Sequence, residues 1–216
     1  MRSGTNDKRH TKLERVLAVA SELFAASDFQ RVCMEDIALG AGVGKGTLYN
    51  LFDSKQDLYF SIIRNRLAEL LDLLERAYDC RKDTLKNLRS LILHLHKFMS
   101  KYPHFYLIWK REENTLVRKD RLGIGELQRR IAALVHRTLE AGTEEGVLRQ
   151  GLDHELLTRL LLGMADGMRK SPVNVRLREK SIDDLFDVLI KGIGVDGLEA
   201  RVTYDEYRHV RSGDVV

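Results

Sequence analysis

The chain has 216 residues, of which 44% are hydrophobic and 31% are charged, and its net charge is +4. This balance excludes a disordered chain, and no apolar run reaches the about 20 residues that a membrane-spanning helix needs. A pI of about 9.0 is compatible with a nucleic-acid partner but does not by itself indicate one. Cys33 and Cys80 form no Cys-x-x-Cys pair and no signal-peptide-like run is present, so we expect a reduced, cytoplasmic protein.

The N-terminal segment combines positive charge with a helical apolar pattern. Residues 1–15 hold five basic and two acidic residues, and the basic ones include Lys8, Arg9 and Lys12. Apolar residues then recur at helical spacing from Leu13 to Phe24, which predicts an amphipathic helix that ends near residues 27–28. On these residues alone, the basic segment is equally compatible with a solvated terminus and with a nucleic-acid contact.

Two short helices are predicted next, at about 34–41 and 44–52. Gly42 between them can adopt the left-handed conformation that ends a helix. Ala38 is small enough to let the two helices cross closely, and Leu48 returns an apolar side chain to the core. This spacing predicts a helix-turn-helix motif at about residues 33–52.

The outward face of the second short helix is unusually small and polar for a surface helix. Counting the start of the following helix, the face carries Gly44, Lys45, Gly46, Thr47, Tyr49, Asn50 and Lys55. Gly46 leaves the backbone open to close approach, while Lys45 and Thr47 can contact phosphates or base edges. A plain helical hairpin with incidental glycines is the alternative, but the preceding helix, the Ala-Gly-Leu spacing and the basic segment favour a DNA groove.

The rest of the chain is predicted to be helical. Ser54 and Asp57 form a capping-box-like start for a long helix over about 55–79. Apolar periodicity then predicts helices at about 84–101, 103–116, 121–144, 153–170 and 181–193. Pro103 suits a first helical turn, and Asp153 and Ser181 suit N-caps. We expect an all-α protein with about nine helices.

Two stretches, RVLAVASELFAASDF and MEDIALGAGVGKGTLYNLFDSKQDL, together resemble the TetR family of bacterial transcriptional regulators. Residues 9–60 carry the resemblance, and the remainder is similar to the family only in the number and length of its helices. The resemblance implies a three-helix helix-turn-helix DNA-binding domain at 10–70, a helical ligand-binding and dimerisation domain at 71–195 and a polar tail at 196–216. It also implies that Lys8, Arg9 and Lys12 lie near the flanking DNA backbone or minor groove, and that operator DNA faces Lys45, Gly46, Thr47, Tyr49, Asn50 and Lys55.

The sequence departs from the family pattern at several positions. Cys33 stands where the family usually has a Ser or Thr N-cap, which predicts a more weakly capped helix. Gly44 stands where a Ser is common, and its presence removes one phosphate contact. Asp28 replaces a usual Gly and Leu51 an aromatic residue or His, so these positions bear on the exact set of DNA contacts.

The middle of the chain is rich in large side chains, and the resemblance implies an effector pocket there. The residues that we assign to this pocket are His94, Phe98, Tyr102, Phe105, Tyr106 and Trp109, with Met164, Asp166 and Met168 from a later helix. Their aromatic and His content predicts a small, mainly apolar effector with one or two hydrogen-bonding groups. The alternative is a filled core, in which case the protein binds DNA as an activator or architectural factor without sensing a small molecule.

Two apolar stripes near the C-terminus predict a homodimer interface. They lie on the helices at 153–170 and 181–193 and include Leu157, Leu160, Leu161, Ala165, Leu185, Phe186, Leu189 and Ile193. Two such helices from each subunit would form a four-helix bundle. Periodicity alone is equally compatible with a core inside one chain, and it is the resemblance that favours the dimer.

No catalytic signature is present, because the chain has no Gly-x-Ser-x-Gly, P-loop or His-Glu-x-x-His motif. His136 and Glu140 are spaced to share a metal, but they are an isolated pair, so a metal-binding helical-bundle enzyme is a remote alternative. We therefore predict a protein without enzymatic activity, metal or cofactor. Its expected function is that of a ligand-responsive transcriptional repressor that binds a palindromic DNA operator as a homodimer, with the effector tilting the helix that starts at Lys55.

Overall fold

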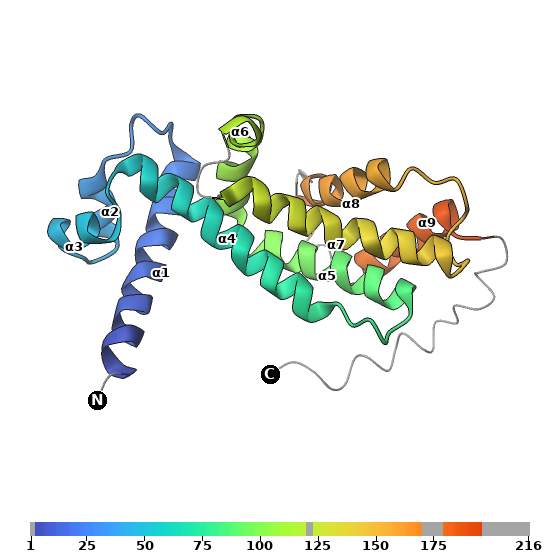
Figure 1. Cartoon of the computed structure of the whole chain (residues 1–216). Helices are drawn as coiled ribbons and strands as arrows, with labels where there is room; N and C mark the ends of the chain where they lie inside the picture. The colour runs from blue at the N-terminus through green and yellow to red at the C-terminus, as the bar shows by residue number, and fades with distance from the viewer. Residues whose placement is uncertain (1–2, 120–122, 170–178, 196–216) are drawn as a thin grey trace. The chain divides into compact units, whose positions relative to one another are not determined.

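The computed structural model describes residues 3–119, 123–169 and 179–195. Within these residues it contains nine α-helices (Figure 1), namely α1 (Ser3–Ala26), α2 (Met34–Gly40), α3 (Lys45–Leu51), α4 (Lys55–Ala77), α5 (Thr84–Lys101), α6 (Pro103–Lys119), α7 (Ile124–Glu144), α8 (His154–Arg169) and α9 (Glu179–Ile193). The extended pairing found in the described ranges is an isolated antiparallel bridge between Leu148 and Gly194. The all-α prediction is therefore confirmed.

Helix α1 begins earlier than its apolar pattern predicts. It starts at Ser3 and includes Gly4, and from Thr5 to Ala26 neither proline nor glycine interrupts it. The basic segment that precedes Leu13 thus belongs to the first turns of a helix.

Local capping signals set two of the later helix starts, as predicted. The backbone N–H of Asp57 donates to Ser54 Oγ at 3.0 Å, and that of Leu156 donates to Asp153 Oδ1 at 2.9 Å. The predicted N-cap at Ser181 is wrong, because α9 begins earlier and contains Ser181 in its first turn.

The chain divides into two compact units. The first consists of Met1–Leu73 together with Lys97–Ile131, and the second of Leu74–His96 together with Ala132–Val216. The first unit therefore holds α1, α2, α3 and α6, the second holds α8 and α9, and α4, α5 and α7 contribute to both.

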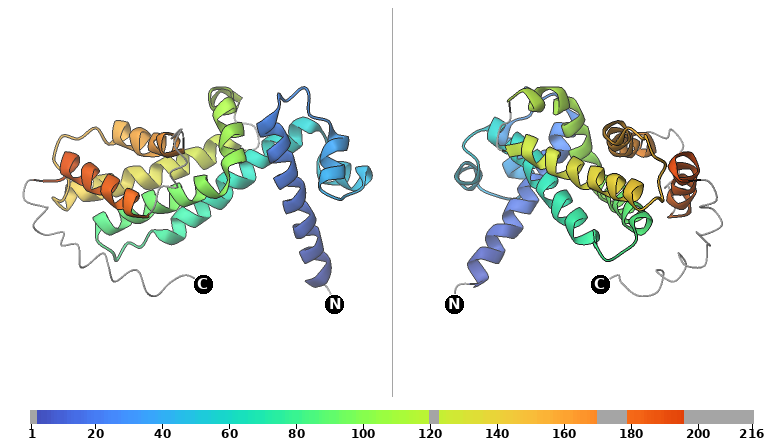
Figure 2. Two further views of the ribbon diagram at one scale, coloured as in Figure 1. Left: turned by 180° about the vertical axis from the view of Figure 1, so that it is seen from behind. Right: turned by 45° about the vertical axis from the view of Figure 1, so that its right-hand side comes forward.

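The core of the first unit is built on α1 and α4. Leu17, Phe24, Leu58 and Ile62 are almost completely buried, and the Phe24 ring packs edge-on against the Tyr59 ring at 4.9 Å. Helices α2 and α6 both contact α1, and α3 contacts α2 (Figure 2). The helix-turn-helix motif therefore packs on this core through the contact of α2 with α1.

The core of the second unit is one apolar cluster contributed mainly by α5, α7, α8 and α9. Its buried members are Leu85, Leu88, Ile92, Val135, Leu139, Leu148, Leu161, Phe186, Ile190 and Ile193. At its edge, the Arg89 guanidinium forms an ion pair with the Asp183 carboxylate and so joins α5 to α9. None of the described helices combines the length and the apolar character of a membrane span.

Candidate nucleic-acid interface

The turn between α2 and α3 has the geometry that the sequence predicts. Gly42 has a φ of 62°, and its backbone N–H donates to Leu39 O at 3.1 Å, while Val43 N donates to Ala38 O at 3.0 Å. Ala38 and Leu48 are buried between the two helices. The crossing of α2 and α3 is therefore fixed by a glycine turn and by a small and a large apolar side chain.

Two glycines of the motif differ in why they are needed. At Gly40, an added methyl group would lie 2.8 Å from Val19 Cγ1, so the close packing of α2 on α1 requires a glycine there. At Gly46, nothing in the described chain lies within 4 Å of such a methyl group. A glycine inside a helix costs about 1 kcal/mol relative to alanine. Gly46 thus weakens α3 without any packing benefit inside the protein.

The predicted reading face of α3 points outward. Gly44, Lys45, Gly46, Tyr49 and Asn50 are exposed, and Thr47 is half-buried. The first turn of α3 holds no acidic residue, and its N-cap, Gly44, provides no side-chain cap. The positive end of the α3 dipole is therefore not compensated within the helix itself.

Lys45 does not stand alone on this face. Its ammonium lies 2.5 Å from Glu35 Oε1, and both side chains are more than half exposed. The hydrogen bond between them lowers the pKa of the Glu35 carboxyl and raises the pKa of the Lys45 ammonium. Sequence reasoning missed Glu35, because residues of two different helices meet here across the turn.

Lys55 has a structural contact that the sequence did not predict. Its ammonium donates to Gln30 O at 3.2 Å and to Val32 O at 3.1 Å, and it lies 4.6 Å from the centre of the Phe29 ring. The charge of Lys55 thus holds the connection between α1 and α2. These contacts give Lys55 a structural role in the free protein, and its predicted contact with DNA stays a prediction.

The N-terminal basic residues can be placed only in part. Lys8 and Arg9 belong to α1, but their side chains lie outside the described residues. Lys12 is exposed on the same helix. These positions are compatible with the predicted contact to flanking DNA and do not test it.

The weak cap predicted at the start of α2 is confirmed. Cys33 is the N-cap of α2 and makes no side-chain cap hydrogen bond; its thiol instead donates to Arg31 O at 3.9 Å. Glu35 and Asp36 in the first turn supply negative charge at the same helix end. Carboxylates thus partly replace the missing hydroxyl cap.

Helix α1 is anchored to α4 by a buried arginine. Arg66 is 8% exposed and donates to Glu14 Oε2 at 3.1 Å and to Glu69 Oε2 at 2.6 Å. The Tyr102 ring covers the guanidinium at 4.2 Å, and the Tyr102 hydroxyl donates to Glu69 Oε1 at 2.6 Å. Burial and this hydrogen bond raise the pKa of the Tyr102 hydroxyl. The network thereby links α1 and α4 to Tyr102, which lies between α5 and α6.

A second arginine fastens the other end of α1. The Arg111 guanidinium of α6 donates to Phe24 O at 2.7 Å, to Ala25 O at 2.9 Å and to Ser27 O at 3.2 Å. These carbonyls end α1, where a helix has unpaired acceptors and a partial negative charge. Neither anchor was predicted from the sequence, since the partners of each arginine are distant in the chain.

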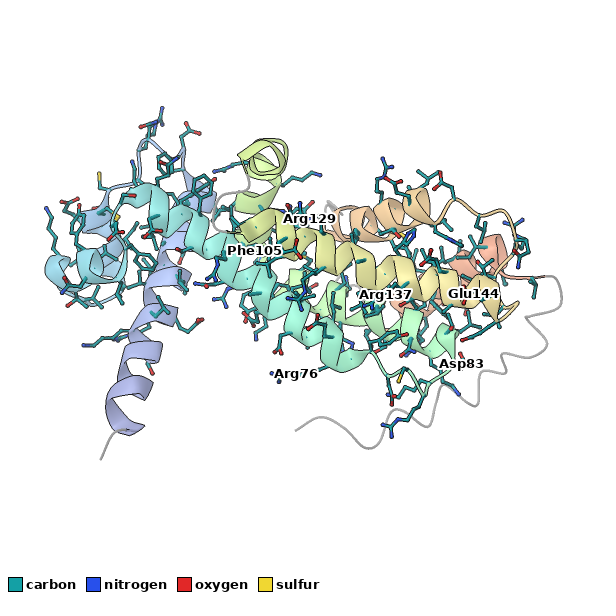
Figure 3. All side chains as sticks on the ribbon, viewed as in Figure 1. Arg76, Asp83, Phe105, Arg129, Arg137 and Glu144 are labelled. Carbon is teal, nitrogen blue, oxygen red and sulfur yellow. The ribbon has the colours of Figure 1, made fainter. Side chains whose placement is uncertain are left out.

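Five of the residues predicted to line an effector pocket form one aromatic cluster. Phe98 packs against Tyr102 at 4.8 Å and Phe105 at 6.2 Å, while Trp109 stacks on Phe105 at 6.0 Å and meets Tyr106 edge-on at 6.3 Å. Phe105, labelled in Figure 3, is almost completely buried.

The indole nitrogen of Trp109 is a buried polar atom within this cluster. Trp109 Nε1 is buried and has no hydrogen-bond acceptor in the part of the chain that the structure describes. A buried donor without an acceptor is destabilising, so such an atom calls for an explanation.

Four further residues were predicted to line the pocket. His94 and Met164 are half-buried and belong to the second unit, and His94 Nδ1 is paired with Ser90 O at 2.7 Å. The side chains of Asp166 and Met168 lie outside the described residues.

The predicted dimer residues separate into two sets. Leu161, Phe186 and Ile193 are buried in the core of the second unit, and Leu157 and Leu189 pack against that core. The chain itself buries Leu161, Phe186 and Ile193, whereas Leu157 and Leu189 are only partly buried, and the assignment of these five residues to a dimer interface stays a prediction. By contrast Leu160 is 54% exposed on α8, as is its neighbour Leu156 at 50%, and Val188 of α9 is 68% exposed. Leu185 is half-buried and Ala165 lies outside the described side chains.

An all-α chain that carries a helix-turn-helix motif with an exposed, small and basic second helix has the architecture of a DNA-binding transcriptional regulator. Comparison with known families agrees. Residues 16–62 match the model of bacterial regulatory proteins of the tetR family, and residues 82–170 match the tetracyclin repressor-like C-terminal domain. The chain belongs to the tetR family of bacterial regulatory proteins, whose members are transcriptional regulators and not enzymes.

Individual proteins show the same relationship. The chain is 30% identical to the HTH-type transcriptional repressor KstR2 of Rhodococcus jostii over 154 residues, which cover 71% of this chain and 74% of the relative. It is also 30% identical to the nucleoid occlusion factor SlmA of Sodalis glossinidius, over 76% of this chain and 83% of that one. The structure of the ketosteroid transcriptional regulator KstR2 of Mycobacterium tuberculosis has the same fold, with a TM-score of 0.73, 22% identity and coverage of 85% of this chain and 95% of that one.

Proposed function

We propose that this DNA-binding regulator is a repressor that binds a palindromic operator as a homodimer and releases it when a small apolar effector binds. The observation that carries the DNA-binding face is Gly46, a helix-weakening residue with open space beside it. Close approach of a DNA backbone or base edge gives that glycine a purpose.

The proposed reading face consists of Gly44, Lys45, Gly46, Thr47, Tyr49 and Asn50, with Lys8, Arg9 and Lys12 near the flanking backbone. Helix α3 would lie in the major groove, where Lys45 can reach a guanine edge or a phosphate and Thr47 a thymine methyl group. Duplexes selected from a random library by the purified protein, followed by affinity measurements against a scrambled duplex, test this. A protein that enriches no sequence would contradict the proposal.

The homodimer is supported by the apolar side chains that one chain leaves exposed. Leu156 and Leu160 lie one turn apart on α8, and Val188 of α9 is 68% exposed. Gly163 and Gly192 have no neighbour within 4 Å of a would-be methyl group, so a second helix could approach closely at these points. One reading helix per chain also needs a two-fold partner to read two half-sites. Analytical ultracentrifugation of wild type and Leu160→Asp tests the dimer.

The effector proposal rests on the aromatic cluster around Trp109. Large apolar side chains with a buried indole donor that lacks an acceptor in the described chain suit an apolar molecule that carries a carbonyl or hydroxyl acceptor. One protein of similar structure is a ketosteroid transcriptional regulator, and a ketosteroid is a molecule of that chemical kind. Trp109 is the only tryptophan of the chain, so its fluorescence reports on this cluster directly.

The anchors of α1 offer a route from such an effector to DNA. Tyr102 belongs both to the aromatic cluster and to the Arg66 network. Arg111, which donates to the end of α1, follows Trp109 of the cluster on α6. A shift of α5 or α6 would thus reach α1, on which α2 packs at Gly40. By linkage, the effector must weaken DNA binding by the factor with which DNA weakens effector binding.

The experiment is a titration of the protein with a panel of steroid ketones and other apolar molecules with one or two polar groups. A true effector changes Trp109 fluorescence and lowers affinity for the selected duplex at the same concentrations. If no compound changes either readout, the result favours a second candidate function, which is DNA binding without small-molecule sensing. The similarity to a nucleoid occlusion factor favours that candidate. Since chromosomal DNA is the proposed target in both cases, we place the protein in the cytoplasm.

A further inference from the structure

The ion pair between Glu35 and Lys45 joins the two helices of the motif at the reading face. Glu35 is in the first turn of α2, and Lys45 is the first residue of α3. Their side chains are 58% and 60% exposed, so the pair lies on the surface that solvent or DNA can reach. This inference rests on the reading face proposed above.

We propose that Glu35 is a positioning residue for Lys45 that holds the lysine ammonium in the free protein and thereby lowers its affinity for unrelated duplex DNA. When operator DNA binds, Lys45 must leave the Glu35 carboxylate and contact acceptors of the DNA instead. The device restrains binding that depends on charge alone.

The electrostatics of α3 explain why Lys45 turns to Glu35. A positive side chain at the first position of a helix is repelled by the partial positive charge of the helix end. Neither the Gly44 N-cap nor any acidic residue in the first turn of α3 offsets this repulsion. The carboxylate of α2, 2.5 Å away, supplies the missing negative charge.

The same pair has a cost for DNA binding. While paired, Glu35 and Lys45 contribute no net charge to a surface that must approach a polyanion. When Lys45 turns to DNA, the freed carboxylate stays close to the phosphates and opposes binding. Each cation that neutralises a phosphate adds about 0.9 to the salt dependence of binding, so removal of Glu35 should steepen this slope by about that amount.

Asp36 provides a matched control. It is exposed in the same first turn of α2 and carries the same charge, but the ion pair that Lys45 forms within the described residues is with Glu35. Glu35→Gln and Asp36→Asn therefore make the same charge change one residue apart. Only the first releases Lys45.

The experiment measures the affinity of the full chain for a scrambled duplex and for a duplex selected by the wild type, from about 50 to 200 mM salt, the range over which phosphate contacts are resolved. We expect Glu35→Gln to tighten binding to the scrambled duplex about fivefold and to steepen the salt slope by about one unit. Asp36→Asn should change the affinity for the scrambled duplex less than about twofold. In a Lys45→Met background, Glu35→Gln should have no more effect than Asp36→Asn.

Several results would overturn the proposal. Equal effects of Glu35→Gln and Asp36→Asn would show general electrostatics, and a Glu35→Gln effect that persists without Lys45 would show that the two residues are not coupled. Weaker binding by Glu35→Gln, at an unchanged melting temperature, would show that the carboxylate assists DNA binding. Failure of the wild type to select any duplex would instead count against the proposed function.

Discussion

The α2–α3 motif and the α8–α9 pair differ in how much of their structure can be predicted from the sequence alone. In the motif, Gly42 makes the turn, and Ala38 and Leu48 fix the crossing, all within a few residues of one another. On α8, Leu160 and Leu161 are consecutive and chemically identical, yet one is 54% exposed and the other 5%. Local signals thus define a turn and an exposed helix face, whereas an apolar stripe does not say which partner covers it.

The largest expected effect comes from this leucine pair. Leu161→Ala should lower the free energy of unfolding by about 3 kcal/mol, because it leaves a cavity in the core of the second unit. Leu160→Ala should change the stability of a single chain little and should weaken self-association instead. Urea denaturation at several protein concentrations separates the two effects. Equal losses of unfolding free energy in the two variants, independent of protein concentration, would contradict the distinction between a core residue and an interface residue.

A smaller effect is expected at the buried anchor of α1. Arg66→Met leaves the Glu14 and Glu69 carboxylates facing each other without their shared cation, and should cost about 2 kcal/mol of stability. Arg129→Met is the control, since Arg129, labelled in Figure 3, pairs with Glu126 on an exposed surface. Such pairs contribute about 0–1 kcal/mol. Thermal unfolding of both variants compares them, and similar losses would mean that the Arg66 network is no anchor.

These two cases also explain what could not be predicted from the sequence. The fold class, most helix boundaries and the motif follow from periodicity, caps and a glycine turn, which act over a few residues. Arg66 and Glu14 are 52 positions apart, and Arg111 and Phe24 are 87 apart, so no local pattern brings them together. The same holds for the structural contacts of Lys55, whose carbonyl partners lie 23 and 25 positions earlier.

Substitutions in the reading face should affect DNA binding and leave folding unchanged. Lys45→Ala and Tyr49→Ala should each weaken binding to the selected duplex by about 1 kcal/mol or more, because each removes a direct contact. Arg159→Ala is a control that removes one exposed positive charge from α8. Fluorescence anisotropy at fixed salt measures all three. If both reading-face variants bound like the Arg159 control, the assignment of the face would be lost.

The smallest change, a single methyl group at Gly46, gives the sharpest comparison, with Gly40→Ala as its structural counterpart. Gly46→Ala should raise the stability of the protein by about 0.5–1 kcal/mol, since it removes a glycine from a helix and meets no atom of the described chain. Gly40→Ala should instead lower stability, because its methyl group meets Val19. Thermal unfolding of the two variants checks both signs.

The deciding measurement is the affinity of Gly46→Ala for the duplex that the wild type selects. We predict a variant that folds at least as well as the wild type and binds this duplex at least about tenfold more weakly, a loss of about 1.4 kcal/mol. A stable Gly46→Ala variant with wild-type affinity would contradict the claim that this face of α3 enters the groove of DNA.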